Sequence, residues 1–226
     1  MIIAFDFDGT VVDSYSCMEE AFVRALEERL HWLPCKRTLA KLLTRLEMHF
    51  ERPTYGRHSG RIKAPFFLRT KFSETWFIER ARLTKVLDGV TEVINELKKR
   101  GHVVISFSAE DFIPGMKERR LRMSGLYDLF DDVIIFGGGR MTIDEAFELV
   151  RRRHGKDTLL WVDDKPWRFI GRGDDKTEYV WHYFPITAKL LKGREGMLSV
   201  IPHLHVIHDI WGVLDVVENL SFSGDV

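Results

Sequence analysis

Two pairs of aspartates follow two short apolar runs of the chain. Asp6 and Asp8 come directly after residues 2–5, and Asp163 and Asp164 come directly after residues 159–162. If the ends of these runs lie side by side, three or four carboxylates share a few ångströms, and two unit charges ~5 Å apart repel by roughly 3 kcal/mol at an effective dielectric constant near 20. A cation is therefore expected among them. Because the candidate ligands are all oxygens, they favour Mg²⁺ over zinc, and Mg²⁺ commonly binds a substrate phosphate as well.

The apolar pattern predicts the sheet that would bring these aspartates together. Predicted strands alternate with helical segments at residues 2–5, 102–109, 132–136, 158–164, 178–184 and 204–210. This alternation predicts an α/β fold with a doubly wound, mostly parallel sheet that is covered on both faces. In such sheets ligands collect beyond the carboxyl ends of the strands. The second predicted strand ends in Ser106 and Ser108, and either hydroxyl could join the aspartates there; we favour Ser108.

Helix signals place the connections between the strands. From Met18 onward apolar residues recur at three- and four-residue spacing, which indicates a helix with one buried face. Asp88 is predicted to cap a helix that Gly101 ends in the left-handed conformation. Thr142 and Glu145 have the spacing of a capping box, which predicts a helix that reaches about residue 153.

Composition limits the class of protein. The 226 residues, 45% of them hydrophobic, suffice for one core and an inserted subdomain. No apolar run approaches the ~18 residues of a membrane span, and no signal segment precedes the first strand, so we expect no membrane association and a cytoplasmic protein. A net charge of zero argues against nucleic acid as a partner. The chain has no Gln and only two Asn, a usage typical of thermophiles.

A basic, helical segment separates the first two predicted strands. Residues 16–85 contain 15 Lys and Arg against 8 Glu and no Asp, and Pro and Gly mark a loop at 52–65. We predict that this segment is an inserted subdomain, and that residues 1–15 and 86–226 form the core. A basic surface beside an acidic site would attract an anionic substrate, although a solvated basic face is an equally good interpretation. The loop supplies four candidate substrate-binding residues: Arg57, His58, Arg61 and Lys63.

The ordered set of motifs resembles the haloacid dehalogenase (HAD) superfamily of phosphotransferases. The resemblance rests on "DFDGT" after the first strand, a Ser at the end of the next core strand, and "VDD" at the end of a later one. It implies that Asp6 is the nucleophile, that Asp8 is the general acid and base, and that Ser108 holds a phosphoryl oxygen. It also implies that Asp163 or Asp164 binds Mg²⁺ with Asp6 and the Asp8 carbonyl. Dehalogenases of this family lack the second carboxylate, so Asp8 points to phosphoryl transfer, in which a leaving group needs a proton.

The resemblance is incomplete at the family's third motif, which normally supplies a Lys. The corresponding segment reads "FGGGRMTIDEAF", so the cation is either Arg140 or Lys165, and we favour Arg140. Thr10, in the first motif, is a further predicted substrate-binding residue. The resemblance makes residues 16–85 a helical cap over a Rossmann-like core and implies Mg²⁺-dependent hydrolysis of a small phosphorylated metabolite through an aspartyl phosphate. A phosphomutase with the same residues, and a catalytically silent module that binds Mg²⁺ and an anion, remain alternatives. The oligomeric state stays open.

Overall fold

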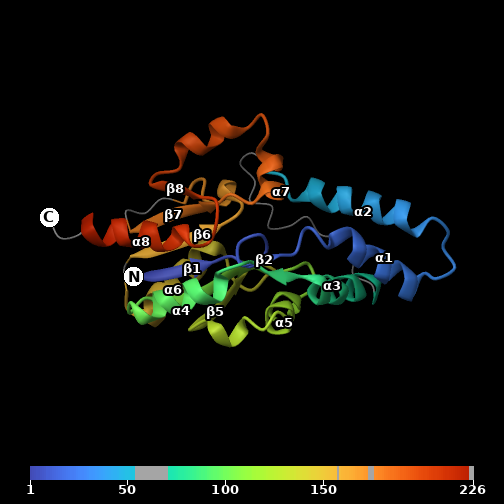
Figure 1. Cartoon of the computed structure of the whole chain (residues 1–226), viewed down its shortest axis with the longest axis horizontal. Helices are drawn as coiled ribbons and strands as arrows, with labels where there is room; N and C mark the ends of the chain where they lie inside the picture. Colours follow the sequence, from blue (N-terminus) through green and yellow to red (C-terminus); the bar gives the residue numbers. More distant parts are fainter. Residues whose placement is uncertain (54–70, 157, 173–175, 224–226) are drawn as a thin grey trace.

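Six parallel strands form the central sheet, in the order β5-β4-β1-β6-β7-β8 (Figure 1). The computed structural model describes residues 1–53, 71–156, 158–172 and 176–223. The strands of the sheet are β1 (Ile2–Phe5), β4 (Val103–Ala109), β5 (Asp132–Phe136), β6 (Leu159–Asp163), β7 (Thr177–His182) and β8 (Leu204–Ile207). The predicted α/β fold with a parallel sheet is therefore confirmed.

The register of the sheet brings the predicted motifs to one edge. β1 lies between β4 and β6, and Phe5 at its end pairs with Ser106 of β4 and with Val162 of β6. The residues that follow these positions on the three strands therefore emerge side by side. Since β4 and β6 lie on opposite sides of β1, the strand order reverses there, which is where open α/β sheets form their ligand crevice.

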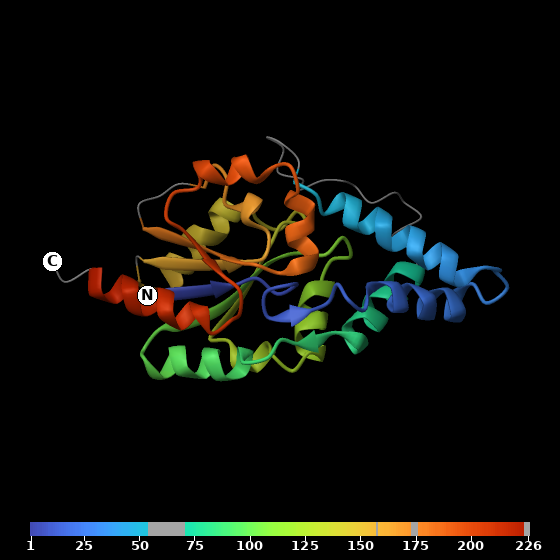
Figure 2. The same ribbon diagram turned by 45° about the horizontal axis from the view of Figure 1, so that its top comes forward.

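Helices cover both faces of the sheet (Figures 1 and 2). Side chains of α4 (Val90–Lys99), α5 (Met116–Met123) and α8 (Gly212–Ser223) join one apolar cluster with the β1 residues Ile3 and Phe5. On the other face α6 (Ile143–His154) packs over Trp161, whose buried ring lies 5.3 Å from the ring of Phe147 and 5.6 Å from that of Phe107. Each large apolar side chain buried in this way contributes roughly 1.5–3 kcal/mol to folding. The sheet edge that carries the motifs is thus held rigidly from both sides.

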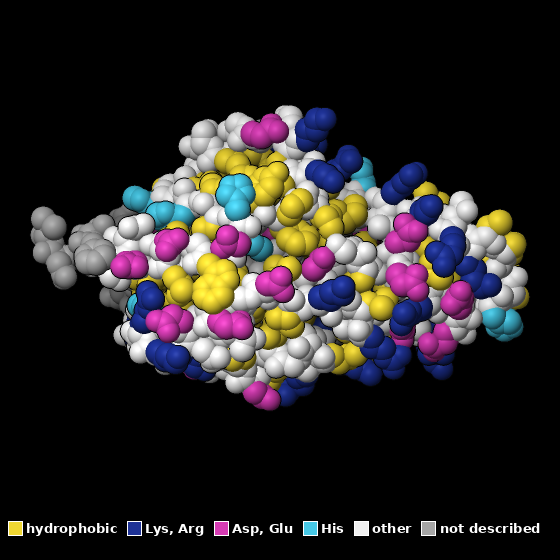
Figure 3. Space-filling model, viewed as in Figure 1, with side chains coloured by type: hydrophobic (Ala, Val, Ile, Leu, Met, Phe, Trp, Pro, Cys, Tyr) yellow, Lys and Arg dark blue, Asp and Glu magenta, His cyan; other side chains and the backbone are white. Residues whose placement is uncertain are grey.

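The segment between β1 and β4 leaves the sheet as three helices. These inserted helices are α1 (Met18–Arg29), α2 (Lys36–Phe50) and α3 (Lys71–Leu83), and the short antiparallel strands β2 (Val12–Asp13) and β3 (Lys85–Val86) join them to the core. Figures 1 and 2 show that they extend away from the sheet, at the end of the molecule opposite both termini. Their own core includes stacked rings of Phe22 and Trp76, with centroids 4.4 Å apart. On the face shown in Figure 3, Lys and Arg side chains gather over these helices but are interspersed with acidic ones.

One predicted cap is wrong and two other helix signals are confirmed. The N-cap residue of α4 is Gly89, with φ +81°, and no side-chain hydrogen bond caps the helix. Asp88 therefore does not have the predicted role. A Cβ at Gly89 would lie 2.4 Å from the Trp211 ring nitrogen, and a left-handed glycine therefore fits both the turn and the packing. Gly101 does adopt φ +79° after α4, and the Thr142–Glu145 capping box opens α6.

The remaining described elements are short helical segments of one or two turns: η2 (Tyr127–Leu129), η3 (Pro166–Arg168), α7 (Pro185–Ala188), η4 (Lys189–Leu191) and η5 (Glu195–Val200). Among the residues that the structure describes, no helix has the length and apolar character that a membrane span needs.

Candidate active site

Three buried aspartates meet at the carboxyl edge of the sheet. Asp6 follows β1, Asp163 ends β6 and Asp164 comes next, and one carboxylate oxygen from each lies within 4.8 Å of the other two. Both carboxylate oxygens of Asp164 are buried and have no hydrogen-bond partner among the described residues. A Cβ at Gly9 would lie 2.3 Å from Asp164 Oδ2, so only glycine lets the chain pass this carboxylate so closely. Three carboxylate oxygens at this spacing, one of them from a carboxylate without a hydrogen-bond partner, fit the ligands of a hard divalent cation such as Mg²⁺.

A guanidinium group already contacts this cluster. Arg168 Nη1 lies 3.2 Å from Asp6 Oδ2 and 2.8 Å from Asp163 Oδ2, and the backbone N–H of Lys165 donates to Asp163 Oδ1 at 2.8 Å. Burial raises the pKa of Asp163 to about 6 against the opposing charge of Arg168, and burial also raises the pKa of Asp164 well above its ordinary value. One guanidinium therefore does not compensate all the negative charge of the cluster. Asp164 has no ion pair within 4.0 Å among the described residues, although the charge of the adjacent Lys165 opposes the rise of its pKa.

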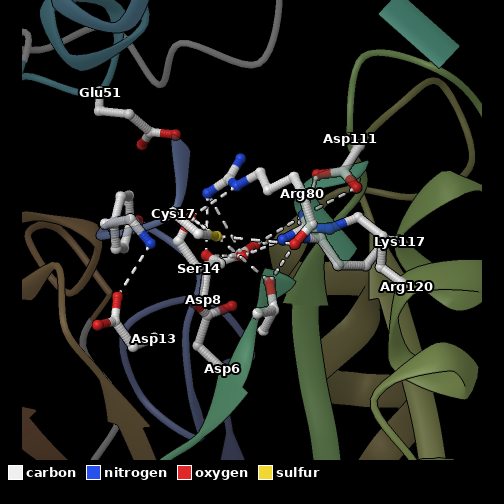
Figure 4. Close-up of polar contacts among 12 residues, drawn as sticks. Asp6, Asp8, Asp13, Ser14, Cys17, Glu51, Arg80, Asp111, Lys117 and Arg120 are labelled. Atoms are coloured by element: carbon white, nitrogen blue, oxygen red, sulfur yellow. Dashed lines mark hydrogen bonds and ion pairs between the residues drawn. The ribbon is translucent and has the colours of Figure 1, made fainter. Parts of the chain in front are cut away.

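The Asp8 carboxylate lies in a second cluster, which is dominated by cations (Figure 4). Its carboxylate accepts hydrogen bonds from Ser14, Lys117 and Arg120. Arg80 Nη2 of α3 lies 3.6 Å from Asp8 Oδ1. Burial alone would raise the pKa of Asp8, but the adjacent Arg120, Lys117 and Arg80 outweigh it and hold that pKa well below its ordinary value. Asp8 is thus an ionised carboxylate among three buried cations.

The second cluster is itself anchored to the core and to the inserted helices. Asp111, in the loop after β4, lies 3.1 Å from Arg120 Nη1 and 3.2 Å from Lys117 Nζ. The Arg80 side chain donates to the Ser14 carbonyl at 3.0 Å and to the Ser14 hydroxyl at 2.9 Å. The orientation of Asp8 consequently depends on Ser14, which follows β2, and on residues from α3 and α5.

Two predicted hydroxyls lie buried without partners. Ser108 Oγ and Thr10 Oγ1 are both shielded from solvent, and neither has a hydrogen-bond partner among the residues that the structure describes. The Tyr15 hydroxyl shares this property. Burying a hydroxyl without a hydrogen-bond partner is costly. These hydroxyls near the aspartates therefore favour a polar ligand that hydrogen-bonds to them.

The two predicted phosphoryl-binding cations, Arg140 and Lys165, each pair with a glutamate. Arg140 follows β5 with its side chain 46% exposed, and its nearest acidic partner in the described part of the chain is Glu110, at 3.5 Å. Lys165 is buried directly after Asp164, but its Nζ lies 2.6 Å from Glu51 Oε2 at the end of α2. Neither makes an ion pair within 4.0 Å with Asp6 or Asp8 in the described ranges. The four predicted loop residues, Arg57, His58, Arg61 and Lys63, lie outside the described residues.

Sequence reasoning missed the cations that do contact the aspartates. Lys117 and Arg120 come from α5, Arg80 comes from α3, and Arg168 comes from η3. The segment "GMKERRLRM" directly after the Ser108 strand was an available signal, because it places basic residues three positions apart on a possible helix. Arg80 had no local signal.

Comparison with known proteins agrees with this architecture. The family model described as haloacid dehalogenase-like hydrolase matches residues 1–167. A candidate HAD hydrolase, YfnB from Bacillus subtilis, solved with bound magnesium, has a TM-score of 0.66 at 14% identity over 96% of this chain and 97% of that chain. A candidate phosphatase from Clostridium difficile has a TM-score of 0.59 at 14% identity over 95% and 97% of the two chains. Identities this low show a common fold only. Comparison with curated proteins gives no match.

The fold and the site define a hydrolase with a Rossmann-like core and a helical insertion after the first strand. Because the family model covers more than half of the sequence, the chain belongs to the haloacid dehalogenase-like hydrolase family. The inserted helices α1, α2 and α3 are its helical cap.

Proposed function

We propose that the protein is a Mg²⁺-dependent phosphatase that hydrolyses a small phosphomonoester through an aspartyl phosphate on Asp6. The observation that carries this proposal is the triad of buried carboxylates at the sheet edge beside two buried hydroxyls that lack partners. Oxygen ligands of this kind suit Mg²⁺, and buried hydroxyl donors suit a phosphoryl group. We further propose residues 1–15 and 86–226 as the core and residues 16–85 as the cap.

In the first step of the reaction the phosphoryl group is transferred from the substrate to Asp6. Asp6 attacks phosphorus in line with the leaving oxygen, and the bond from phosphorus to that oxygen breaks. Ser108 and Thr10 donate to the equatorial oxygens. Asp6, Asp163 and Asp164, with the Asp8 carbonyl, would hold the metal, which supplies positive charge against the phosphoryl oxygens. Arg168 keeps the Asp6 carboxylate oriented through its 3.2 Å contact.

Asp8 would move the proton in both halves of the reaction. In the resting site it is ionised, so it must take a proton from solvent before it can protonate the leaving oxygen. Binding of the substrate promotes this protonation. The negative charge of its phosphate dianion raises the pKa of Asp8 and competes with Asp8 for Lys117 and Arg120. In the second half water attacks phosphorus, the bond from phosphorus to the Asp6 oxygen breaks and inorganic phosphate leaves. The ionised Asp8 accepts the proton that this water loses.

Lys117 replaces Arg140 and Lys165 as our candidate for the cation that binds the phosphoryl group. Its ammonium is buried beside Asp8, and two of its three donors serve Asp8 and Asp111. Arg120 is less free, because its two terminal nitrogens both bind these same aspartates. Lys117 can therefore turn a donor to the substrate while Arg120 keeps Asp8 in place.

The test is the turnover of p-nitrophenyl phosphate by purified protein with Mg²⁺ or with EDTA. We expect turnover that requires Mg²⁺ and falls to background in Asp6→Asn and in Asp8→Asn, since neither carboxylate can replace the other. Glu148→Gln, which changes an exposed carboxylate on α6 to an amide, is the matched control and should keep full activity. Undiminished turnover in Asp6→Asn would exclude the covalent mechanism. A wild type that binds Mg²⁺ and phosphate without turnover would support the silent binding module instead.

A further inference from the structure

A small pocket lies in the cap, between α1, α2, α3 and the loop that follows β4. Its walls include Phe22, Phe50, Phe72, Trp76 and Phe112, and one carboxylate, that of Glu47, lies among them. The pocket encloses about 30 Å³. A single water needs roughly 10–15 Å³ of such a cavity, so the space takes a small head group rather than a ring.

The Glu47 carboxylate has no hydrogen bond or ion pair within the described part of the chain, although it lies in an apolar pocket. Burial raises the pKa of Glu47 to about 7, and the nearby Glu51 raises it further, while Arg80 and Lys165 oppose this shift. The Glu47 side chain is half-buried. A carboxylate without a partner in apolar surroundings is costly, and a cation beside it reduces that cost. The pocket therefore favours a ligand with positive charge.

The aromatic walls favour the same kind of ligand. The rings of Phe22 and Trp76 stack at 4.4 Å with an angle of 7° between their planes, and Phe72 continues the stack at 6.4 Å from Phe22. The facing sides of Phe22 and Trp76 cover each other, but Phe50 and Phe112 also line the pocket. Aromatic rings attract ammonium groups within about 6 Å of the ring centre. An uncharged alkyl group would satisfy the rings but would leave Glu47 unpaired, so a cation uses both features of the pocket.

The pocket borders the phosphoryl site. The Arg80 guanidinium lies 5.5 Å from the centre of the Trp76 ring, and the same side chain lies 3.6 Å from Asp8. On the other side, Phe112 directly follows Asp111, which contacts Lys117 and Arg120. A substrate that occupied both sites would therefore pass beside the Arg80 side chain.

We propose that this pocket binds a cationic head group at the far end of the leaving group, so that the substrate is the phosphomonoester of a small amino alcohol. The amine is protonated or quaternary and pairs with Glu47. This inference rests on the proposed phosphatase function and adds the class of substrate.

The test compares esters of matched shape that differ in charge. We expect wild-type kcat/KM to be at least ~10-fold higher for 3-aminopropyl phosphate than for butyl phosphate, because only the former gains an ion pair and a cation–π contact. Glu47→Gln should abolish this preference and leave the rate on butyl phosphate within about twofold of wild type. Glu28→Gln, in which the side chain on α1 is 51% exposed, is the matched control and should keep the preference. Equal kcat/KM for the two esters in the wild type, or a preference that persists in Glu47→Gln, would overturn the assignment.

Two further measurements keep the outcomes distinct. If Glu47→Gln does not fold, Phe72→Leu tests the ring wall and should reduce the preference severalfold; an unchanged preference counts against the pocket. Calorimetric binding of the two esters to Asp6→Asn separates recognition from catalysis. If the wild type hydrolyses no ester, the phosphatase proposal fails, whereas tighter binding of 3-aminopropyl phosphate to Asp6→Asn would still support the pocket. Equal binding of both esters by Asp6→Asn refutes the pocket alone.

Discussion

Asp6 and Asp8 are two residues apart, yet their replacement by Asn should change stability in opposite directions. Asp8 is buried, accepts hydrogen bonds from Arg120 and Lys117, and lies 3.6 Å from Arg80. Removing one partner of a buried ion pair commonly costs 3–5 kcal/mol, because the remaining charges stay buried without compensation. Asparagine keeps an oxygen that can accept hydrogen bonds, so we expect Asp8→Asn to lose about 3 kcal/mol, the low end of that range. For a chain of this size this corresponds to a decrease in Tm of roughly 6–12 °C.

Asp6 has the opposite surroundings. It is one of three carboxylates whose oxygens lie within 4.8 Å of one another, with Arg168 as the nearest cation. Neutralising Asp6 reduces this repulsion, and Arg168 keeps its 2.8 Å contact with Asp163. Without metal, Asp6→Asn should therefore be as stable as the wild type or more stable by about 1 kcal/mol.

The assay is urea unfolding at pH 7 in EDTA, with Glu148→Gln as the surface control. That control should stay within about 0.5 kcal/mol of the wild type. If Asp8→Asn is within 1 kcal/mol of the wild type, or if Asp6→Asn is the less stable of the two variants, the assignment of two oppositely charged clusters is wrong.

Three further predictions concern the cation and the metal. Lys117→Ala should lower kcat by at least ~10²-fold, since one preorganised charge-stabilising donor is worth roughly 3 kcal/mol in the transition state, whereas Arg140→Ala should change kcat little. A larger loss in Arg140→Ala than in Lys117→Ala in steady-state assays would make Arg140 the phosphoryl-binding cation instead. In EDTA the free energy of unfolding of the wild type, relative to that of Asp163→Asn, should fall as pH rises from about 4 to about 6, because folded Asp163 retains a proton that the unfolded chain has lost. A flat or rising difference in urea titrations across this window argues against it. Mg²⁺ at 100 times its Kd should stabilise the wild type by about 2.7 kcal/mol, and Asp164→Asn should lose most of that gain in thermal unfolding; an undiminished gain would remove Asp164 from the metal site.

The parts of the fold that sequence predicts well are those set by local pattern. Continuous apolar runs marked β1, β4 and β6, and the polar residues at their ends identified the site, because parallel strands bring their carboxyl ends to one edge. The Asp88 cap failed because the choice between Asp88 and Gly89 depends on how closely Trp211 packs. That contact joins residues far apart in the chain and leaves no local signal.

The cations around Asp8 illustrate a second limit. Arg80 is 72 positions from Asp8 and Arg120 is 112 positions from it, so the contacts arise only when the cap and α5 pack against β1. On a sequence, a Lys or Arg in a charged helix has the same appearance whether it is solvated or buried beside a carboxylate. Arg140 lay nearest the expected motif, but its side chain is 46% exposed. Burial, which decides between these cases, is a property of the folded chain.

The most direct test of the central claim is detection of the covalent intermediate. Wild-type protein is mixed with p-nitrophenyl phosphate and Mg²⁺, quenched in acid within the first turnovers, digested and analysed by peptide mass spectrometry. We predict one added phosphoryl group on the N-terminal peptide at Asp6, and its absence in Asp6→Asn or when EDTA replaces Mg²⁺. Hydrolysis that proceeds with no phosphorylated peptide, or phosphorylation at a residue other than Asp6, would contradict the account.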